Sequence, residues 1–366
     1  ERTVMKIAIV TLTKGANYGN RLQNYAVENV LKGIGYRAVT LSDFRFADID
    51  ALHRCWYLLK RAFKISNYNY TYRQLRFSKF NDKLLSYSSA SNANIDSFDY
   101  VVYGSDQIWN THFEASVVAD FSFLFGETVP KRKKVAYSAS VGTGDIPEEY
   151  KKRIAKALRD FRSISVREEQ AANMICELTG RKVPVTIDPT LMLDAADWQR
   201  IEKKPRYVRK NEKILLTYFL GDLSPERKAY IDTVARQFGL RVVALQNEWA
   251  KDISDPAVYA TTPDEFIWLV HHCRLMLTDS FHGSVFSMLF DKPFRCFGRQ
   301  ESGVADMSSR LDTLFGKFGI GDWCCGTVQE DPDHIFYKDY ASVPMVLERE
   351  RQFALDYLKN ALEIHE

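Results

Sequence analysis

Residues 273–290, CRLMLTDSFHGSVFSMLF, give the clearest structural signal in the chain. The apolar run at 273–277 predicts a buried strand, and the apolar run at 285–290 predicts a helix that ends before Lys292-Pro293. The polar segment between the two runs therefore follows the carboxyl end of a strand. Open α/β sheets bind their ligands at this end of their strands.

This polar segment places several hydrogen-bonding groups around one histidine. We expect Ser280, the His282 ring and the backbone amides of Gly283 and Ser284 to meet at one point. Amides at the start of a helix suit an anion, and a glycine lets the backbone approach that anion closely. The alternative is a capped helix whose histidine is hydrogen-bonded in the core.

The alternation of strand and helix runs through the rest of the chain. In the first half we predict strands at 6–12, 37–41, 100–103, 134–139, 163–166 and 183–187, with helices at 21–34, 148–159 and 168–178. In the second half we predict strands at 213–219 and 241–245, with helices that begin at 224 and cover 263–271. The pattern predicts an α/β fold of two Rossmann-like domains with a cleft between them. We expect these domains at 5–197 and 212–344, followed by a helical segment at 345–366 that packs back on the first domain.

The bulk composition is that of an ordinary globular protein. Of the 366 residues, 46% are hydrophobic and 27% are charged, and the net charge is +3. A chain of this length exceeds what one hydrophobic core usually serves, in agreement with two domains. Because no stretch approaches the roughly 20 apolar residues that cross a bilayer, and no signal-peptide pattern opens the sequence, we expect a cytoplasmic protein.

The cysteines and histidines do not predict a metal site. The six cysteines form no C-x-x-C pair, and several lie in apolar runs, where a thiol packs as a small hydrophobic group. The adjacent His271 and His272 have no acidic or cysteine ligand at a useful spacing. We therefore expect neither a disulfide nor a bound metal.

Neutral amides follow the first predicted strand. Asn17, Asn20, Gln23 and Asn24, together with Tyr18, suit a ligand that is rich in hydroxyl groups. The segment lacks the G-x-G-x-x-G spacing of a dinucleotide site. The alternative is a turn with an asparagine cap.

A second polar segment, GSDQIWN at 104–110, follows the predicted strand at 100–103. Asp106, Gln107 and Trp109 combine a carboxylate, an amide and an indole, a mixture that sugar sites commonly need. The alternative is a capped loop with Trp109 in the core.

Two arginines stand where anions are bound in such folds. Arg167 ends the strand at 163–166, and its guanidinium is able to bind a carboxylate or phosphate through two hydrogen bonds. The alternative for Arg167 is an ion pair with Glu168, Glu169 or Asp188. Arg310 follows two serines before an apolar helix, where the alternative is a helix cap.

Taken together, these segments resemble the polysaccharide pyruvyl transferase family over about residues 6–320. The residues that carry the resemblance are NYGN at 17–20 with Gln23-Asn24, GSDQIWN at 104–110, SVRE at 165–168, DPT at 188–190, SFHG at 280–283, KPF at 292–294 and SR at 309–310. The resemblance implies two Rossmann-like halves in a GT-B-like arrangement. It also implies transfer of the pyruvyl group of phosphoenolpyruvate to two sugar hydroxyls as a cyclic ketal, without a cofactor.

The resemblance and the chemistry of this reaction suggest roles for the candidate residues. The family implies that Arg167 and His282 hold the donor. We expect Ser280, the amides of Gly283 and Ser284, and Arg310 to bind the donor beside them. His282 would protonate carbon or assist the departure of phosphate, because an imidazole ordinarily titrates near neutral pH. Asp106 is the candidate for the acceptor hydroxyl. The amide-rich segments, with Gln107 and Trp109, are the expected acceptor site.

A basic and aromatic segment at 52–81 contains no acidic residue. Its composition would fit a nucleic-acid site, but no recognised motif supports one. We expect it to contact an anionic membrane, because acceptors in this family are often lipid-linked. The alternative is a solvated helical face with aromatic packing.

Two other functions remain open from the sequence. One is a metal-independent glycosyltransferase that uses a nucleotide sugar on the same two-domain plan. The other is a glycan-binding protein without catalytic activity.

Overall fold

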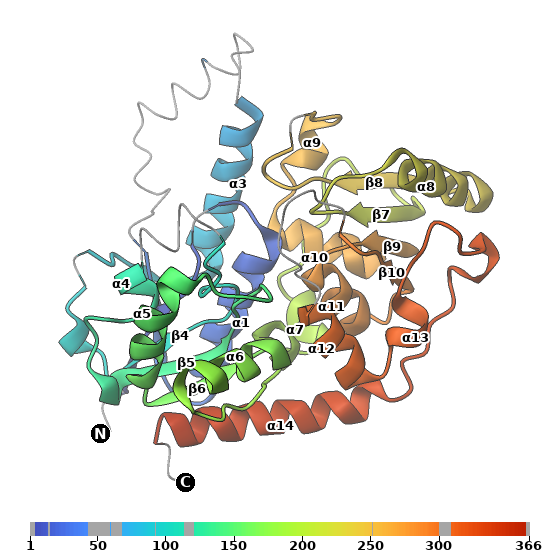
Figure 1. Cartoon of the computed structure of the whole chain (residues 1–366). Coiled ribbons are helices and arrows are strands. Elements are labelled where there is room, and N and C mark those ends of the chain that lie inside the picture. The colour runs from blue at the N-terminus through green and yellow to red at the C-terminus, as the bar shows by residue number, and fades with distance from the viewer. Residues whose placement is uncertain are drawn as a thin grey trace.

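Two parallel β-sheets, each covered by helices, form two lobes in the computed structural model of the chain (Figure 1). The structure describes residues 4–13, 15–42, 59, 68–91, 93–112, 121–250, 252–299 and 309–363. The expected α/β class with two Rossmann-like sheets is confirmed.

The N-terminal lobe holds a six-stranded sheet in the order β3-β2-β1-β4-β5-β6. Its strands are β1 (Lys6–Val10), β2 (Arg37–Leu41), β3 (Tyr87–Ser88), β4 (Tyr100–Tyr103), β5 (Lys134–Ala139) and β6 (Ser163–Val166). All neighbouring strands pair in parallel. The order reverses between β1 and β4, and this switch point is where Rossmann folds bind their ligands.

The C-terminal lobe holds a four-stranded parallel sheet in the order β10-β9-β7-β8. Its strands are β7 (Ile214–Tyr218), β8 (Arg241–Leu245), β9 (Leu275–Thr278) and β10 (Phe294–Cys296). The order reverses between β7 and β9. The two central strands β7 and β9 are fully buried, as expected for parallel strands covered on both faces.

The helices begin and end where local capping chemistry dictates. The N-terminal lobe contains α1 (Tyr18–Gly33), α3 (Tyr68–Leu84), α4 (Phe121–Leu124), α5 (Glu148–Arg159), α6 (Glu169–Thr179) and α7 (Ala195–Gln199). The remaining helices are α8 (Pro225–Phe238), α9 (Pro256–Tyr259), α10 (Pro263–His272), α11 (Phe281–Leu289), α12 (Ser309–Phe318), α13 (Gly321–Cys324) and α14 (Val343–Ala361). Ser224 caps α8 ahead of Pro225, and Gly239 ends α8 in the left-handed conformation.

Two predicted elements differ from the structure. The predicted strand at 183–187 is reduced to one bridge, between Val185 and Val166. The helix predicted at 285–290 begins earlier, at Phe281, because Ser280 acts as its N-cap. His282 therefore lies in the first turn of α11 and not in a loop.

The lobes share one continuous hydrophobic core. Tyr18 of α1 stacks on Phe266 of α10 with ring centroids 4.9 Å apart, and its ring edge contacts Tyr218 of β7 at 5.2 Å. Helix α3 contacts both α9 and α10, so it connects the lobes as well (Figure 1). Each lobe is therefore held in a fixed position against the other.

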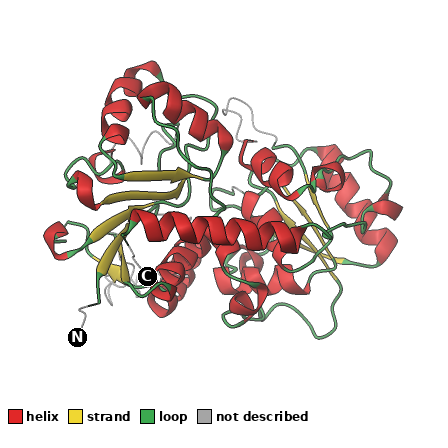
Figure 2. Ribbon diagram, turned by 90° about the horizontal axis from the view of Figure 1, so that it is seen from below, coloured by secondary structure: helices red, strands yellow, loops and turns green. Residues whose placement is uncertain are grey.

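The last helix, α14, runs across both lobes (Figure 2). Near its carboxyl end the Tyr357 hydroxyl donates to the Ala136 carbonyl oxygen of β5 at 2.6 Å, and the Tyr36 hydroxyl donates to the Leu362 carbonyl oxygen at 3.1 Å. The chain thus returns to the first lobe.

Half of the basic segment at 52–81 lies outside the described residues, including Arg54, Lys60, Arg61 and Lys64. Its described part turns inward, since Arg73 and Phe77 are buried. Contact with a membrane stays a prediction. Within the described ranges, no helix is long and apolar enough to cross a membrane.

Candidate functional site

A pocket of about 340 Å³ lies between the carboxyl ends of the two sheets. From the N-terminal lobe it is lined by Ala16, Asn17, Asp106, Gln107, Asn110, His112 and Thr143. The rest of its lining is Tyr218, Leu220, Asn247, Glu248, Trp249, Ser280, Phe281, His282, Arg299 and Arg310. Both switch points contribute, so the pocket belongs to neither lobe alone.

Asp106 follows β4, and each of its carboxylate oxygens is hydrogen-bonded. Oδ1 accepts from Arg167 Nη2 at 3.2 Å and from the Gln107 backbone amide at 2.9 Å, and Oδ2 accepts from Asn20 Nδ2 at 3.1 Å. Burial by itself would raise the pKa of Asp106. Arg167 and His282 outweigh this effect and hold the pKa below its usual value. Asp106 is therefore an ionised carboxylate in the pocket wall.

Arg167 lies behind Asp106 and does not line the pocket. Its guanidinium contacts three carboxylates, with Nη1 at 2.6 Å from Asp188 Oδ2, Nη2 at 3.2 Å from Asp106 Oδ1 and Nε at 3.9 Å from Glu168 Oε2. Although burial lowers the pKa of Arg167, these carboxylates raise it above its usual value. The structure thus matches the ion-pair alternative, and Arg167 lies behind two residues of the pocket wall, Asp106 and Phe281, with Cζ 5.1 Å from the Phe281 ring centroid.

His282 faces both lobes from the first turn of α11. Its Nε2 lies 3.8 Å from Asp188 Oδ1 and, among the described residues, is buried without a hydrogen-bond partner. Its ring lies against Gly19 of α1, because a Cβ atom at Gly19 would be 1.9 Å from His282 Nδ1. The imidazole therefore occupies its place in the pocket wall because residue 19 has no side chain.

Asp188 connects the two candidate donor residues. It contacts Arg167 on one side and His282 on the other, and its Oδ1 accepts from the Thr190 hydroxyl at 2.6 Å. Burial would raise the pKa of Asp188, but His282 and Arg167 stabilise its charged form and lower the pKa far below the usual value. The arginine and the histidine that were expected to hold the donor are thus linked by one buried carboxylate.

The amides of Gly283 and Ser284 are not available to an anion, in contrast to our expectation. The Gly283 amide donates to Ser280 Oγ at 3.3 Å, and the Ser284 amide donates to the Ser280 carbonyl oxygen at 3.0 Å. Gly283 is small for a packing reason, because a Cβ atom there would lie 2.7 Å from Met276 Cε and Thr278 Oγ1. The amides of Phe281 and His282 come first in α11 and, within the described ranges, form no hydrogen bond. Any anion at this helix would meet these two amides.

Arg310 is the predicted arginine that does line the pocket. The side-chain amide of Gln107 satisfies its neighbours when its oxygen faces Arg310. In this orientation the oxygen accepts hydrogen bonds from Arg310 Nη1 at 2.8 Å and from Nη2 at 3.1 Å. Burial and the nearby charge of Arg167 lower the pKa of Arg310 to about 9. A buried cation beside a second cation favours the arrival of an anion.

The expected acceptor residues divide into two groups. Asn17, Asp106 and Gln107 line the pocket, and Asn20 holds Asp106. The others are buried away from the pocket: Tyr18, Gln23, Asn24 and Trp109. The Trp109 indole, for example, donates to the Leu124 carbonyl oxygen at 3.3 Å and stacks on Phe125.

Sequence reasoning missed several residues of the pocket. Asn247, Glu248 and Trp249 directly follow β8, and Arg299 follows β10. These residues follow the carboxyl ends of strands, and the same position identified His282. Strand β8 was predicted from the sequence, so Asn247, Glu248 and Trp249 could have been found in this way. For Arg299, the three-residue strand β10 was too short to predict.

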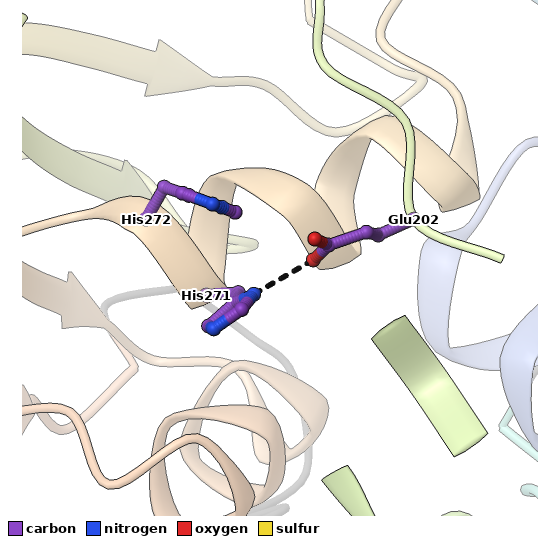
Figure 3. Close-up of side chains that lie close together, drawn as sticks. All are labelled: Glu202, His271 and His272. Atoms are coloured by element: carbon purple, nitrogen blue, oxygen red, sulfur yellow. Dashed lines mark hydrogen bonds and ion pairs between the residues drawn. The ribbon is translucent and has the colours of Figure 1, made fainter. Parts of the chain in front are cut away.

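A separate group of side chains is able to hold a metal ion. Glu202, His271 and His272 place one ligand atom each within 4.8 Å of one another (Figure 3). The Glu202 carboxylate lies 2.8 Å from His271 Nδ1, and His272 Nδ1 is 2.9 Å from the Trp268 carbonyl oxygen. The fold therefore supplies the acidic neighbour that the sequence spacing did not predict. None of the three residues lines the pocket.

Comparisons with known proteins complete the description. A family model described as polysaccharide pyruvyl transferase matches residues 17–301. By sequence, no curated protein matches the chain.

Similar solved structures share little sequence with the chain. The UDP-GlcNAc 2-epimerase from Neisseria meningitidis is 13% identical, with 98% of each chain covered and a TM-score of 0.46. A putative UDP-N-acetylglucosamine 2-epimerase from Listeria monocytogenes is 11% identical, with 99% of this chain and 96% of that chain covered and a TM-score of 0.48. A UDP-glucosyltransferase from Polygonum tinctorium is 12% identical, with 99% of each chain covered and a TM-score of 0.39. At these values we draw no functional argument from them.

Proposed function

This chain belongs to the polysaccharide pyruvyl transferase family, and from that premise we propose which reaction its pocket performs. The proposed reaction moves the pyruvyl group of phosphoenolpyruvate onto two hydroxyls of a sugar in a surface-polysaccharide precursor, forming a cyclic ketal. One observation carries the proposal. The pocket between the lobes brings a buried imidazole nitrogen without a hydrogen-bond partner among the described residues together with an ionised carboxylate and two arginines.

The donor is an enol phosphate with two anionic groups, and the pocket offers arginines for one and backbone amides for the other. Arg310 and Arg299 line the pocket. The first two backbone amides of α11 stand at the N-terminus of a helix, a position that suits an anion. The volume of about 340 Å³ lies at the small end of ligand pockets, which are roughly 300–1,000 Å³. We assign the phosphate to the start of α11 and the carboxylate to the arginines.

The reaction requires two proton transfers that balance. The methylene carbon of the donor takes up one proton, the first sugar hydroxyl adds to the central carbon and loses a proton, and phosphate then leaves as the second hydroxyl adds. The two hydroxyl protons thus end on the methyl group and on phosphate. His282 Nε2 is the group we assign to these transfers, since it forms no hydrogen bond with another described residue and lies 3.8 Å from the Asp188 carboxylate.

Asp106 suits a different task. A carboxylate whose pKa is held below the usual value is a weak base, and both of its oxygens are already hydrogen-bonded. We propose that Asp106 orients the acceptor hydroxyl and stabilises the cationic carbon that forms after protonation. Arg167 then acts as a positioning residue, because it holds Asp106 and Asp188 without reaching the pocket.

The test is phosphate release from phosphoenolpyruvate in the presence of pyranoside acceptors and the absence of nucleotide. We expect His282→Ala to lower turnover roughly 10²-fold or more, as for the loss of a general acid. The matched control is His334→Ala, which removes an exposed histidine outside the pocket and should leave turnover unchanged. Consumption of a nucleotide sugar without phosphate release would instead support a glycosyltransferase. Glycan binding that is unaffected by His282→Ala, without turnover, would support a binding protein.

A further inference from the structure

Two exposed aromatic rings stand together at the pocket. Trp249 is 73% exposed and Tyr70 is 36% exposed, and their ring centroids lie 6.4 Å apart in a stacked arrangement. Trp249 follows β8 and lines the pocket, whereas Tyr70 belongs to α3. We infer that Trp249, backed by Tyr70, is the platform on which the pyranose ring of the acceptor stacks. This inference rests on the proposed function and names a subsite of the same pocket.

The backbone around Trp249 is held in place while its indole remains exposed. Asn247 Oδ1 accepts from the Trp249 amide at 2.9 Å, and Asn247 Nδ2 donates to the Leu220 carbonyl oxygen at 2.8 Å. The Glu248 carbonyl oxygen accepts from the Tyr259 hydroxyl at 2.8 Å, and the Glu248 carboxylate accepts from the Ala16 amide at 2.7 Å. A ring that is fixed before binding loses little conformational entropy when a ligand stacks on it.

The chemistry of the platform fits a pyranose ring. One face of a pyranose presents C–H groups, which pack on an indole, while the hydroxyls project around the edge of the ring. Asn17 lines the same pocket, and its side-chain oxygen is already used to cap α1 by accepting from the Asn20 amide at 3.2 Å. Within the described part of the chain the NH₂ group of Asn17 forms no hydrogen bond, so it is able to donate to a sugar hydroxyl. Because Trp249 shares a pocket with Asp106 and His282, the ring on the platform has its hydroxyls near the reacting groups.

The platform also replaces the indole that the sequence suggested. Trp109 is buried and hydrogen-bonded to a backbone carbonyl oxygen, so it cannot contact a sugar. Trp249 supplies an indole on the pocket side of the fold. The indole of the acceptor site thus comes from the C-terminal lobe.

Saturation-transfer NMR tests the platform directly, without depending on turnover. The probes are methyl β-D-galactopyranoside, methyl β-D-glucopyranoside and methyl α-D-mannopyranoside, with uridine diphosphate as a competing aromatic ligand. The variants are Trp249→Ala, Trp249→Phe and, as a matched control, Tyr337→Ala, which removes an exposed aromatic ring outside the pocket. Circular dichroism establishes that each variant is folded.

We expect at least one glycoside to show saturation transfer to the C–H protons of one ring face. Trp249→Ala should weaken its binding about tenfold, whereas Trp249→Phe and Tyr337→Ala should bind it like the wild type. Equal binding by Trp249→Ala and the wild type, no glycoside binding at all, or Trp249-dependent binding of uridine diphosphate alone would each overturn the inference. Phosphate release from phosphoenolpyruvate is measured in parallel. Trp249-dependent glycoside binding without phosphate release would contradict the proposed function and leave the platform standing.

Discussion

At the scale of single residues, Gly19 and His282 bring the two lobes into contact beside the pocket. A Cβ atom at position 19 would lie 1.9 Å from His282 Nδ1 and 2.5 Å from Cγ and Cε1 of the same ring. No real side chain tolerates such contacts, so any larger residue at position 19 must displace the imidazole. The placement of His282 therefore depends on a residue of the opposite lobe.

The substitution Gly19→Ala tests this dependence. We expect it to lower turnover at least about tenfold, because the displaced imidazole no longer delivers its proton in the correct geometry. Gly33→Ala in the same helix is the control, since a Cβ atom there meets nothing within 4 Å. That variant should keep full turnover and gain up to about 1 kcal/mol of stability. Wild-type turnover in Gly19→Ala would refute the contact.

The buried carboxylate of Asp188 predicts how stability depends on pH. Its folded-state pKa is lower than the unfolded value of about 3.9, so its contribution to stability is fully present above that value. The contribution is lost as the pH falls below about 4 toward the folded-state pKa. Asp188 is therefore one source of the acid sensitivity of the fold.

Urea unfolding of Asp188→Asn between pH 7 and pH 3 measures this contribution. Removing one partner of a buried ion pair should lower the free energy of unfolding at pH 7 by about 3–5 kcal/mol. The variant should also lose less stability than the wild type as the pH falls. Asp96→Asn is the control, because the Asp96 side chain is largely exposed. Parallel pH dependences for Asp188→Asn and the wild type would show that Asp188 is not a stabilising carboxylate.

At the scale of elements, α14 fastens the two lobes together. Leu358 is fully buried in the shared core, whereas Phe353 on the same helix is 46% exposed. The hydroxyl of Tyr357 bonds to β5 of the N-terminal lobe, and Lys317 of α12 pairs with Glu350 at 2.6 Å. Helix α14 thus connects the N-terminal sheet with α12.

Two alanine substitutions separate the buried face of α14 from its exposed face. Leu358→Ala should lower the free energy of unfolding by about 2–5 kcal/mol, through lost burial and the cavity that remains. Phe353→Ala should change it by no more than about 0.5 kcal/mol. Both values are measured by urea denaturation. Similar losses for the two variants would contradict the packing described here.

The elements also explain why the fold could be predicted well from the sequence. Strands such as β4 and β9 are short apolar runs, and helices such as α8 and α10 carry both Pro at their first turn and a capping residue. These signals are local. Strand β3 has two residues and β10 has three, so neither produces a pattern that a sequence can reveal.

The site was less predictable, because the direction of a loop side chain depends on tertiary packing. His282 and Asp106 were found from their positions after strands, and Arg310 from its position before an apolar helix, and all three line the pocket. Trp109 and Tyr18 follow strands as well, yet both rings turn into the core. For Arg167 the sequence left two alternatives open, ligand binding and ion pairing. In the structure Arg167 forms ion pairs with Asp106 and Asp188.

At the scale of the whole molecule, the pocket is assembled from two lobes that share a core. Arg73 of α3 helps to hold the two lobes together, because its guanidinium donates to the carbonyl oxygens of Ala16, Gln246 and Tyr259. These three residues belong to segments on both sides of the pocket. We therefore expect the donor to meet a site that is largely formed before binding.

Every role proposed for these residues requires that phosphoenolpyruvate binds in this pocket. A crystal structure of the protein soaked with phosphoenolpyruvate would show where the donor binds. We predict density for a three-carbon acid phosphate in contact with His282 and Arg310, with phosphate oxygens at the first amides of α11. Density for the donor at a site away from both residues, or an unoccupied pocket at a saturating donor concentration, would contradict the account.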